Sequence, residues 1–294
     1  MKMITRHVGF ISGPVNVGII RFENQAILID TGLDDTSAKK ILTLTQEAGI
    51  QITGILNTHA HADHYGGNAR IKKSTATLNF IYAPAVEDAV IRHPILEPVY
   101  LFGAYPIAQL KGKFLMGKPS PATPLPAPTL PFGDLKIQVV PLPGHSINQV
   151  GYVCEDVFFC ADALFPEGIV EKYGLLYCFD VEAHRKTLNM MKRRSSHKMV
   201  VPCHARPRQN ISLLIEENLR HMEEIAEAIL ALTHAPKTSE ALTSQLCNQK
   251  QIPMKSIWQY HLHHNTVKAY LAALLKEGLI SVFVEDHSLI WVKK

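Results

Sequence analysis

The residues with the clearest chemical meaning are three histidines and one aspartate within six positions, His59-Ala-His61-Ala-Asp63-His64. The cluster follows an apolar run that ends near Leu56. Imidazole nitrogens and carboxylate oxygens bind Zn²⁺ and, less selectively, Fe or Mn, and the lack of cysteine in the cluster argues against a closed structural zinc site. The sequence therefore predicts a catalytic metal site, with zinc favoured over iron and manganese.

The spacing of the cluster suits two ions rather than one. His59 and His61 are two positions apart at the end of an expected strand, so their side chains can point the same way. Asp63 and His64 follow in a turn and can point elsewhere. One segment could therefore supply ligands to two metals.

Three further polar residues stand at the ends of apolar, strand-like runs. His145 follows a run over residues 135–140 and a Pro-Leu-Pro-Gly turn, Asp162 ends the run 157–161, and His204 ends the run 199–203. Because sites in α/β proteins are commonly built at the carboxyl ends of strands, these three are candidates to complete a metal centre.

In this order, the HxHxDH motif, Gly-His, Asp and His resemble the metallo-β-lactamase-fold hydrolases over roughly residues 1–207. The resemblance implies one metal on His59, His61 and His145, a second on Asp63, His64 and His204, and Asp162 bridging both. The segment Ile29-Asp30-Thr31-Gly32 also matches this family, whose aspartate supports a ligand. Asp30 is therefore expected to hold a ligating imidazole, because such rings generally need a partner on the other nitrogen.

The resemblance implies hydrolysis. Two ions that share a bridging hydroxide lower the pKa of water and polarise a carbonyl or phosphoryl oxygen. We expect cleavage of a small ester or thioester, with Asp63 and Asp162 as the catalytic carboxylates. Two alternatives stay open: a single-strand endoribonuclease with the same dinuclear site, and a mononuclear-iron sulfur dioxygenase, whose motif is similar. The histidine at position 61 favours a hydrolase over the diiron oxidases of the family.

Substrate contacts are suggested by Lys172, Tyr173 and Tyr177, which follow Asp162. Glyoxalase II enzymes place a Lys and a Tyr at a similar distance from the bridging aspartate to bind glutathione. In this chain the Lys and Tyr are adjacent rather than separated by one residue. The alternative interpretation is that all three are solvated loop residues.

Composition indicates a two-part protein without a membrane span. The chain has 294 residues, of which 47% are apolar, and its apolar stretches are broken well before the roughly 20 residues needed to cross a bilayer. The N-terminal residues lack the apolar core of a signal peptide. The five cysteines have no paired spacing, which is typical of reduced thiols and predicts a cytoplasmic location.

The order of expected elements indicates an α/β fold. Short strands between residues 8 and 29, a helix over 36–48 and strands between 135 and 159 suit the four-layer αββα sandwich of the resembled family, which we assign to residues 1–207. Residues 208–294 are expected to form a linker helix over 211–232 and a small helical, winged-helix-like domain. Its helices are predicted at 239–247 and 266–277, followed by a hairpin.

The charge balance of the C-terminal part indicates which partners it can bind. From residue 208 onward there are nine Lys plus Arg and nine Asp plus Glu, and this neutral balance argues against DNA binding. RNA remains an alternative substrate to a small ester or thioester, and the sequence leaves a homo-oligomer open. The proline-rich segment 91–131 is predicted to form a lid or a dimer contact rather than plain packing.

Overall fold

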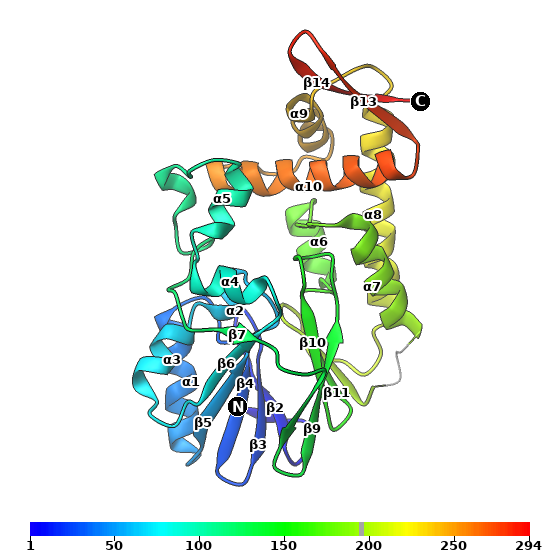
Figure 1. The fold of residues 1–294 in the computed structure, drawn as a ribbon. Coiled ribbons are helices and arrows are strands. Elements are labelled where there is room, and N and C mark those ends of the chain that lie inside the picture. The colour runs from blue at the N-terminus through cyan, green and yellow to red at the C-terminus, as the bar shows by residue number, and fades with distance from the viewer. Residues whose placement is uncertain (194–196) are drawn as a thin grey trace.

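The computed structural model describes residues 1–193 and 197–294. Two β-sheets face each other at its centre (Figure 1). The first sheet has the order β1 (Lys2–Met3), β2 (Val8–Ile11), β3 (Val17–Phe22), β4 (Gln25–Ile29), β5 (Gln51–Leu56), β6 (Phe80–Ala83), β7 (Thr123–Pro124). The second has the order β12 (Met199–Pro202), β11 (Val157–Ala161), β10 (Val150–Cys154), β9 (Leu135–Pro141), β8 (Thr129–Phe132).

Helices cover the outer face of each sheet. The helices that follow strands of the first sheet are α1 (Asp35–Glu47), α2 (Ala62–Tyr65), α3 (Asn68–Ser74), α4 (Glu87–Arg92) and α5 (Leu96–Phe102), with a 3-10 turn at Ala108–Leu110. Those that follow strands of the second sheet are α6 (Glu167–Tyr173), α7 (Val181–Arg193) and α8 (Ser212–Leu232). Figure 1 shows α1 and α3 on one side of the two sheets and α7 and α8 on the other.

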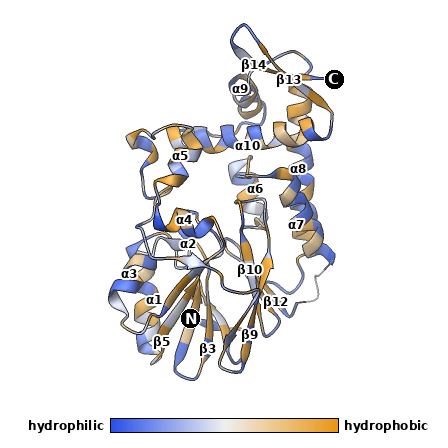
Figure 2. Ribbon diagram, viewed as in Figure 1, coloured by the Kyte–Doolittle hydropathy of each residue, from blue (hydrophilic) through white to orange (hydrophobic). Residues whose placement is uncertain are grey.

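Alternation along the strands explains the layers. In β3 and β4, Ile19 and Leu28 pack toward α1 and α3, whereas Ile20 and Ile27 pack against the second sheet. Both faces of these strands are buried, so the strands read as continuous apolar runs, which Figure 2 shows in orange. The predicted α/β fold with an αββα arrangement is confirmed.

The C-terminal part begins with α8 and continues through α9 (Ser239–Gln249), α10 (Ile257–Lys276) and the hairpin β13 (Ile280–Glu285) and β14 (Ser288–Lys293). The predicted helical region is confirmed, while its description as a winged helix and the division at residue 207 stay predictions. Among the described residues, no helix is long and apolar enough to span a membrane.

Two predicted helix boundaries were wrong. The last helix was expected from residue 266, but α10 starts at Ile257, where the Ser256 side chain accepts a hydrogen bond from the backbone N–H of Gln259. The first helix was expected from residue 36, but α1 starts at Asp35, because the Asp34 carboxylate caps it by accepting from two N–H groups of the first turn. The earlier start of α10 matters because it carries the helix across to α5 (Figure 1).

Asn218 docks α8 onto the loop after β11. Its side-chain amide donates to the carbonyl of Phe165 at 2.8 Å and to that of Leu214 at 2.9 Å. Its carbonyl oxygen accepts from the Phe165 N–H at 3.1 Å. All of these contacts are buried, so a single amide satisfies both backbone groups of Phe165.

We predict that Asn218→Ala lowers the free energy of unfolding by about 3 kcal/mol, because it leaves the buried backbone groups of Phe165 without partners. Urea denaturation followed by circular dichroism measures the change. Asn248→Ala, at an exposed position of α9, is the matched control and should change the value by less than about 0.5 kcal/mol. An equal effect of the two substitutions would contradict the docking role of Asn218.

Candidate metal centre

Strand ends from both sheets bring the candidate ligands together. The segment with His59, His61, Asp63 and His64 follows β5, and the other three candidates follow β9, β11 and β12. Positive φ angles change the direction of the chain directly before two of these candidates. Ala161, directly before Asp162, has a φ of 51°, and Gly144, directly before His145, has a φ of 128°. A Cβ at position 144 would lie 2.3 Å from the His184 nitrogen, so the turn requires glycine.

Three imidazoles form the first group. The Nδ1 atom of His61 lies 3.0 Å from the Nε2 atom of His59 and 2.9 Å from the Nε2 atom of His145. Burial lowers the pKa of His61 to about 4 and lowers the pKa values of His59 and His145 well below the usual range. The three rings are therefore neutral, which is the form in which imidazole binds a metal.

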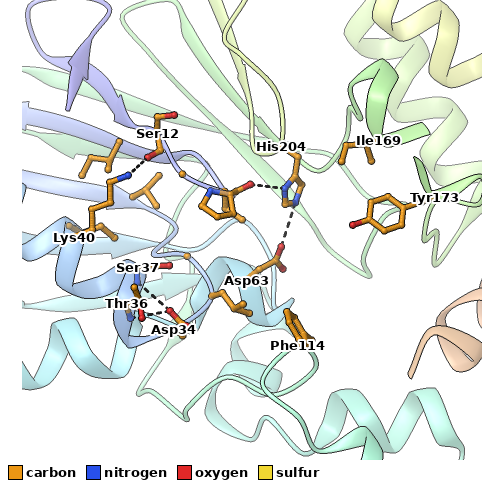
Figure 3. Close-up of a pocket in the computed structure, with 18 of the residues that line it drawn as sticks. Ser12, Asp34, Thr36, Ser37, Lys40, Asp63, Phe114, Ile169, Tyr173 and His204 are labelled. Atoms are coloured by element: carbon orange, nitrogen blue, oxygen red, sulfur yellow. Dashed lines mark hydrogen bonds and ion pairs between the residues drawn. The ribbon is translucent and has the colours of Figure 1, made fainter. Parts of the chain in front are cut away.

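Asp63, His64 and His204 form the second group. One carboxylate oxygen of Asp63 lies 3.8 Å from the Nε2 atom of His64, and the other lies 3.5 Å from the Nε2 atom of His204. Figure 3 shows the Asp63 and His204 side chains pointing toward each other. Burial alone would lower the pKa of His204, but the carboxylates of Asp162 and Asp63 raise it to about 9. The surroundings of the second group thus favour positive charge.

Asp162 lies between the two groups. Its Oδ2 atom is 3.6 Å from the Nε2 atom of His145 in the first group. The same oxygen is 3.4 Å from the Nε2 atom of His64 and 3.2 Å from the Nε2 atom of His204 in the second. The structure therefore brings all seven predicted ligands into one cluster.

Unpaired atoms within the cluster show whether it fits metal ions. The Nε2 atom of His64 and the Oδ1 atom of Asp162 are buried and have no hydrogen-bond partner among residues 1–193 and 197–294. Such groups are costly to bury unless something compensates them. Cations held by nitrogen and oxygen would supply that compensation, so the residues present fit a metal centre.

Asp30 contacts the ring of His64, and its role in supporting a metal ligand stays a prediction. Its Oδ2 atom lies 2.9 Å from the Nδ1 atom of His64, while Thr58 donates to its carboxylate from both the backbone N–H and the hydroxyl at 2.8 Å. The His64 Nε2 atom is thereby left to face the cluster. Cys203 also approaches Asp30, with its sulfur 3.9 Å from the carboxylate, and burial raises the pKa of its thiol to about 12.

The three predicted substrate residues lie in different places. Tyr173 lines the large cavity beside His204 and Asp63, shown in Figure 3. The ring of Tyr177 packs against His61 at 5.4 Å, and its backbone carbonyl lies 3.2 Å from the Nδ1 atom of His145. The Lys172 amine lies over the Tyr173 ring at 4.9 Å. Contact of any of the three with substrate stays a prediction.

Sequence reasoning missed Glu87, a buried carboxylate at the start of α4. Its two oxygens accept from the Ala60 N–H at 2.9 Å, the Ser146 hydroxyl at 2.7 Å and the Asn148 N–H at 3.0 Å. Glu87 thus connects the loop of His59 and His61 to the loop of His145. No local pattern marks it, because its partners lie 27 and 59 or more positions away in the chain.

Comparison with known proteins agrees with this arrangement. Residues 11–204 match the family described as the metallo-beta-lactamase superfamily. A hydroxyacylglutathione hydrolase from Shewanella loihica is 26% identical over 228 residues, which cover 75% of this chain and 74% of that relative. Another from Albidiferax ferrireducens is 28% identical over 157 residues, and this match covers 52% of this chain and only 48% of the relative's length.

Solved structures show the same fold. A metallo-beta-lactamase family protein from Thermus thermophilus has a TM-score of 0.75 at 19% identity, with 99% of this chain and 100% of that chain covered. A beta-lactamase domain protein from Burkholderia ambifaria gives 0.76 at 14% identity, with coverages of 99% and 92%. A metallo-beta-lactamase from Pontibacter korlensis gives 0.56 at 16% identity and covers 76% of this chain and 97% of its own.

We predict that Glu87→Gln weakens zinc binding by about tenfold, since loss of an outer partner typically costs that much or more. The glutamine amide would present a donor to the Ala60 N–H, which needs an acceptor. Competition with a chromophoric chelator measures the affinity. Glu47→Gln, on the exposed face of α1, is the control and should bind zinc as the unmodified protein does. Unchanged affinity in Glu87→Gln would refute this role.

Proposed function

This chain belongs to the metallo-β-lactamase superfamily, and we propose that it is a dinuclear metallohydrolase, loaded with two zinc ions, that cleaves a small ester or thioester. The observation that carries the proposal is the position of Asp162. One buried oxygen of this carboxylate lies within 3.6 Å of imidazole nitrogens from both ligand groups. A shared carboxylate of this kind supports two neighbouring cations rather than one.

The proposed division of labour follows from burial. Bound divalent cations lower the pKa of water toward neutrality and polarise the carbonyl oxygen of an ester. Asp162 is almost fully buried and would bind both ions from the interior of the protein. Asp63 is about one third exposed and lines the cavity, so it is placed to accept a hydrogen bond from the attacking water and orient it. Neither step requires a serine or cysteine nucleophile.

A thioester is the favoured substrate class because the curated relatives are hydroxyacylglutathione hydrolases. Single-strand RNA cleavage and iron-dependent sulfur dioxygenation stay alternative activities. Assembly into a homo-oligomer also stays open. All five cysteines are buried and free, which supports the proposed cytoplasmic location.

Metal content and activity of an Asp162→Ala variant test the proposal. The unmodified protein, purified without added metal, should contain about two equivalents of zinc and hydrolyse thioesters. The variant should lose at least about one equivalent and at least about 100-fold in rate, because a ligand matters more than the outer residues whose loss costs ~10–100-fold. Elemental analysis and a thiol-release assay provide the two readouts.

Asp134→Ala, an exposed change in the turn between β8 and β9, serves as the control and should retain both metal and rate. One equivalent of iron that is unaffected by Asp162→Ala would contradict the dinuclear hydrolase. It would redirect the search to oxygen-dependent sulfur chemistry.

A further inference from the structure

One space beside the centre is a cavity of about 730 Å³ that is lined by both Asp63 and His204. This size lies within the range of ~300–1,000 Å³ usual for small-molecule sites. Asp63 and His204 belong both to the candidate metal centre and to the cavity lining, as Figure 3 shows. A substrate whose reacting carbonyl sits at the centre would therefore extend into this cavity.

On the side of the first sheet, the lining combines apolar side chains with three residues that carry hydroxyl groups. Ile11 and Val17 come from β2 and β3, and Val15 from the turn between these strands. Leu33 and Ile41 come from the segment before α1 and from α1 itself. These side chains offer no hydrogen bonds, so they suit a hydrocarbon group.

Charge in the lining does not suit an anionic group. Lys40 is the one lysine or arginine among the described residues that line the cavity, and its amine donates to the Ser12 carbonyl at 2.6 Å. Of the two carboxylates that line the same cavity, that of Asp34 pairs with the Lys113 amine at 3.0 Å and that of Asp63 belongs to the candidate metal centre. Among the described lining residues, no free lysine or arginine is therefore left to pair with the two carboxylates of a glutathione moiety.

The outer wall is aromatic and comes from two distant parts of the chain. Phe114, from the segment 91–131, stacks on Trp258 of α10 with ring centroids 5.9 Å apart. Trp258 packs on Leu101, Leu110 and Leu115 of the same segment. The side chain of Asn265 donates to the Leu101 carbonyl at 3.0 Å, which also holds α10 in place.

Phe114 remains 58% exposed at the cavity although it is a large apolar side chain. Tyr173 and Ile169, from α6, continue the wall on the side of His204, as Figure 3 shows. Exposed apolar surface beside polar groups is typical of a ligand-binding site.

A second space near His61, bordered by Tyr177, Phe179 and Ile147, measures only about 10 Å³. That is roughly the volume needed to hold one water molecule. Of these two spaces, the cavity beside Asp63 and His204 is therefore the one that admits a chain of several carbons.

We propose that the substrate carries an uncharged, unbranched acyl chain that binds in this cavity, and that Phe114 and Trp258 set the preferred chain length. The inference rests on the proposed thioester hydrolysis and specifies its acyl group. It assigns a role in substrate selection to both the segment 91–131 and α10. Burying each methylene in the cavity raises kcat/KM by about fourfold until the cavity is filled.

Hydrolysis of acetyl, butanoyl, hexanoyl and octanoyl thioesters of N-acetylcysteamine tests this directly. The unmodified protein should favour the longer chains, and Phe114→Ala or Trp258→Ala should lower the octanoyl-to-acetyl ratio of kcat/KM by at least about tenfold. Phe283→Ala, which removes a half-exposed phenylalanine from β13, is the matched control and should leave the ratio as it is. A flat series, or a preference for a hydroxyacyl glutathione thioester over the octanoyl one, would overturn the proposal.

A binding measurement separates this inference from the proposed function. The chain contains two tryptophans, Trp258 and Trp291. The non-hydrolysable S-octyl thioether of N-acetylcysteamine should change tryptophan fluorescence in Trp291→Phe but not in Trp258→Phe, and should bind more tightly than the S-methyl thioether. If no thioester is hydrolysed but this binding is seen, hydrolysis fails while the apolar chain site stands. Equal affinity for the two thioethers, or no binding, refutes the chain site itself.

Discussion

The structure depends on the concentration of seven candidate ligand side chains in a small, largely buried volume. Three neutral imidazoles point their nitrogens at one another across about 3 Å. Beside them, His64 and Asp162 each keep a buried polar atom without a hydrogen-bond partner among the described residues. Such an arrangement is unfavourable unless cations compensate it. If the proposed metals bind, their binding is therefore coupled to folding.

The fold provides the rigid frame that holds these ligands. Each candidate ligand follows a strand, so its position is determined by one of the two packed sheets rather than by a long loop. Asp30 and Glu87 then fix what the strands leave free: Asp30 sets the orientation of His64, and Glu87 connects the two loops of the first group. Asp30 and Glu87 are therefore positioning residues, because they act by holding candidate ligands in place.

The fold class and the gathering of the candidate ligands in one cluster could be predicted because their evidence is local. The HxHxDH motif and the apolar runs before His145, Asp162 and His204 are visible along the chain. Glu87 could not be found in this way, since its partners come from other loops, and neither could the pairing of Phe114 with Trp258, which are 144 positions apart (258 minus 114). The start of α10 was missed because the Ser256 cap was not recognised. Glu87 and the Phe114–Trp258 pair thus show that contacts between distant segments limit what can be predicted from the sequence.

The central claim is that Asp162 stands between two metal ions, and anomalous diffraction tests it most directly. Crystals grown with zinc would be measured on both sides of the zinc absorption edge. The account predicts two peaks, one among His59 Nε2, His61 Nδ1 and His145 Nε2, and the other among Asp63, His64 Nε2 and His204 Nε2. A single peak, or a peak between Asp30 and Cys203, would contradict it.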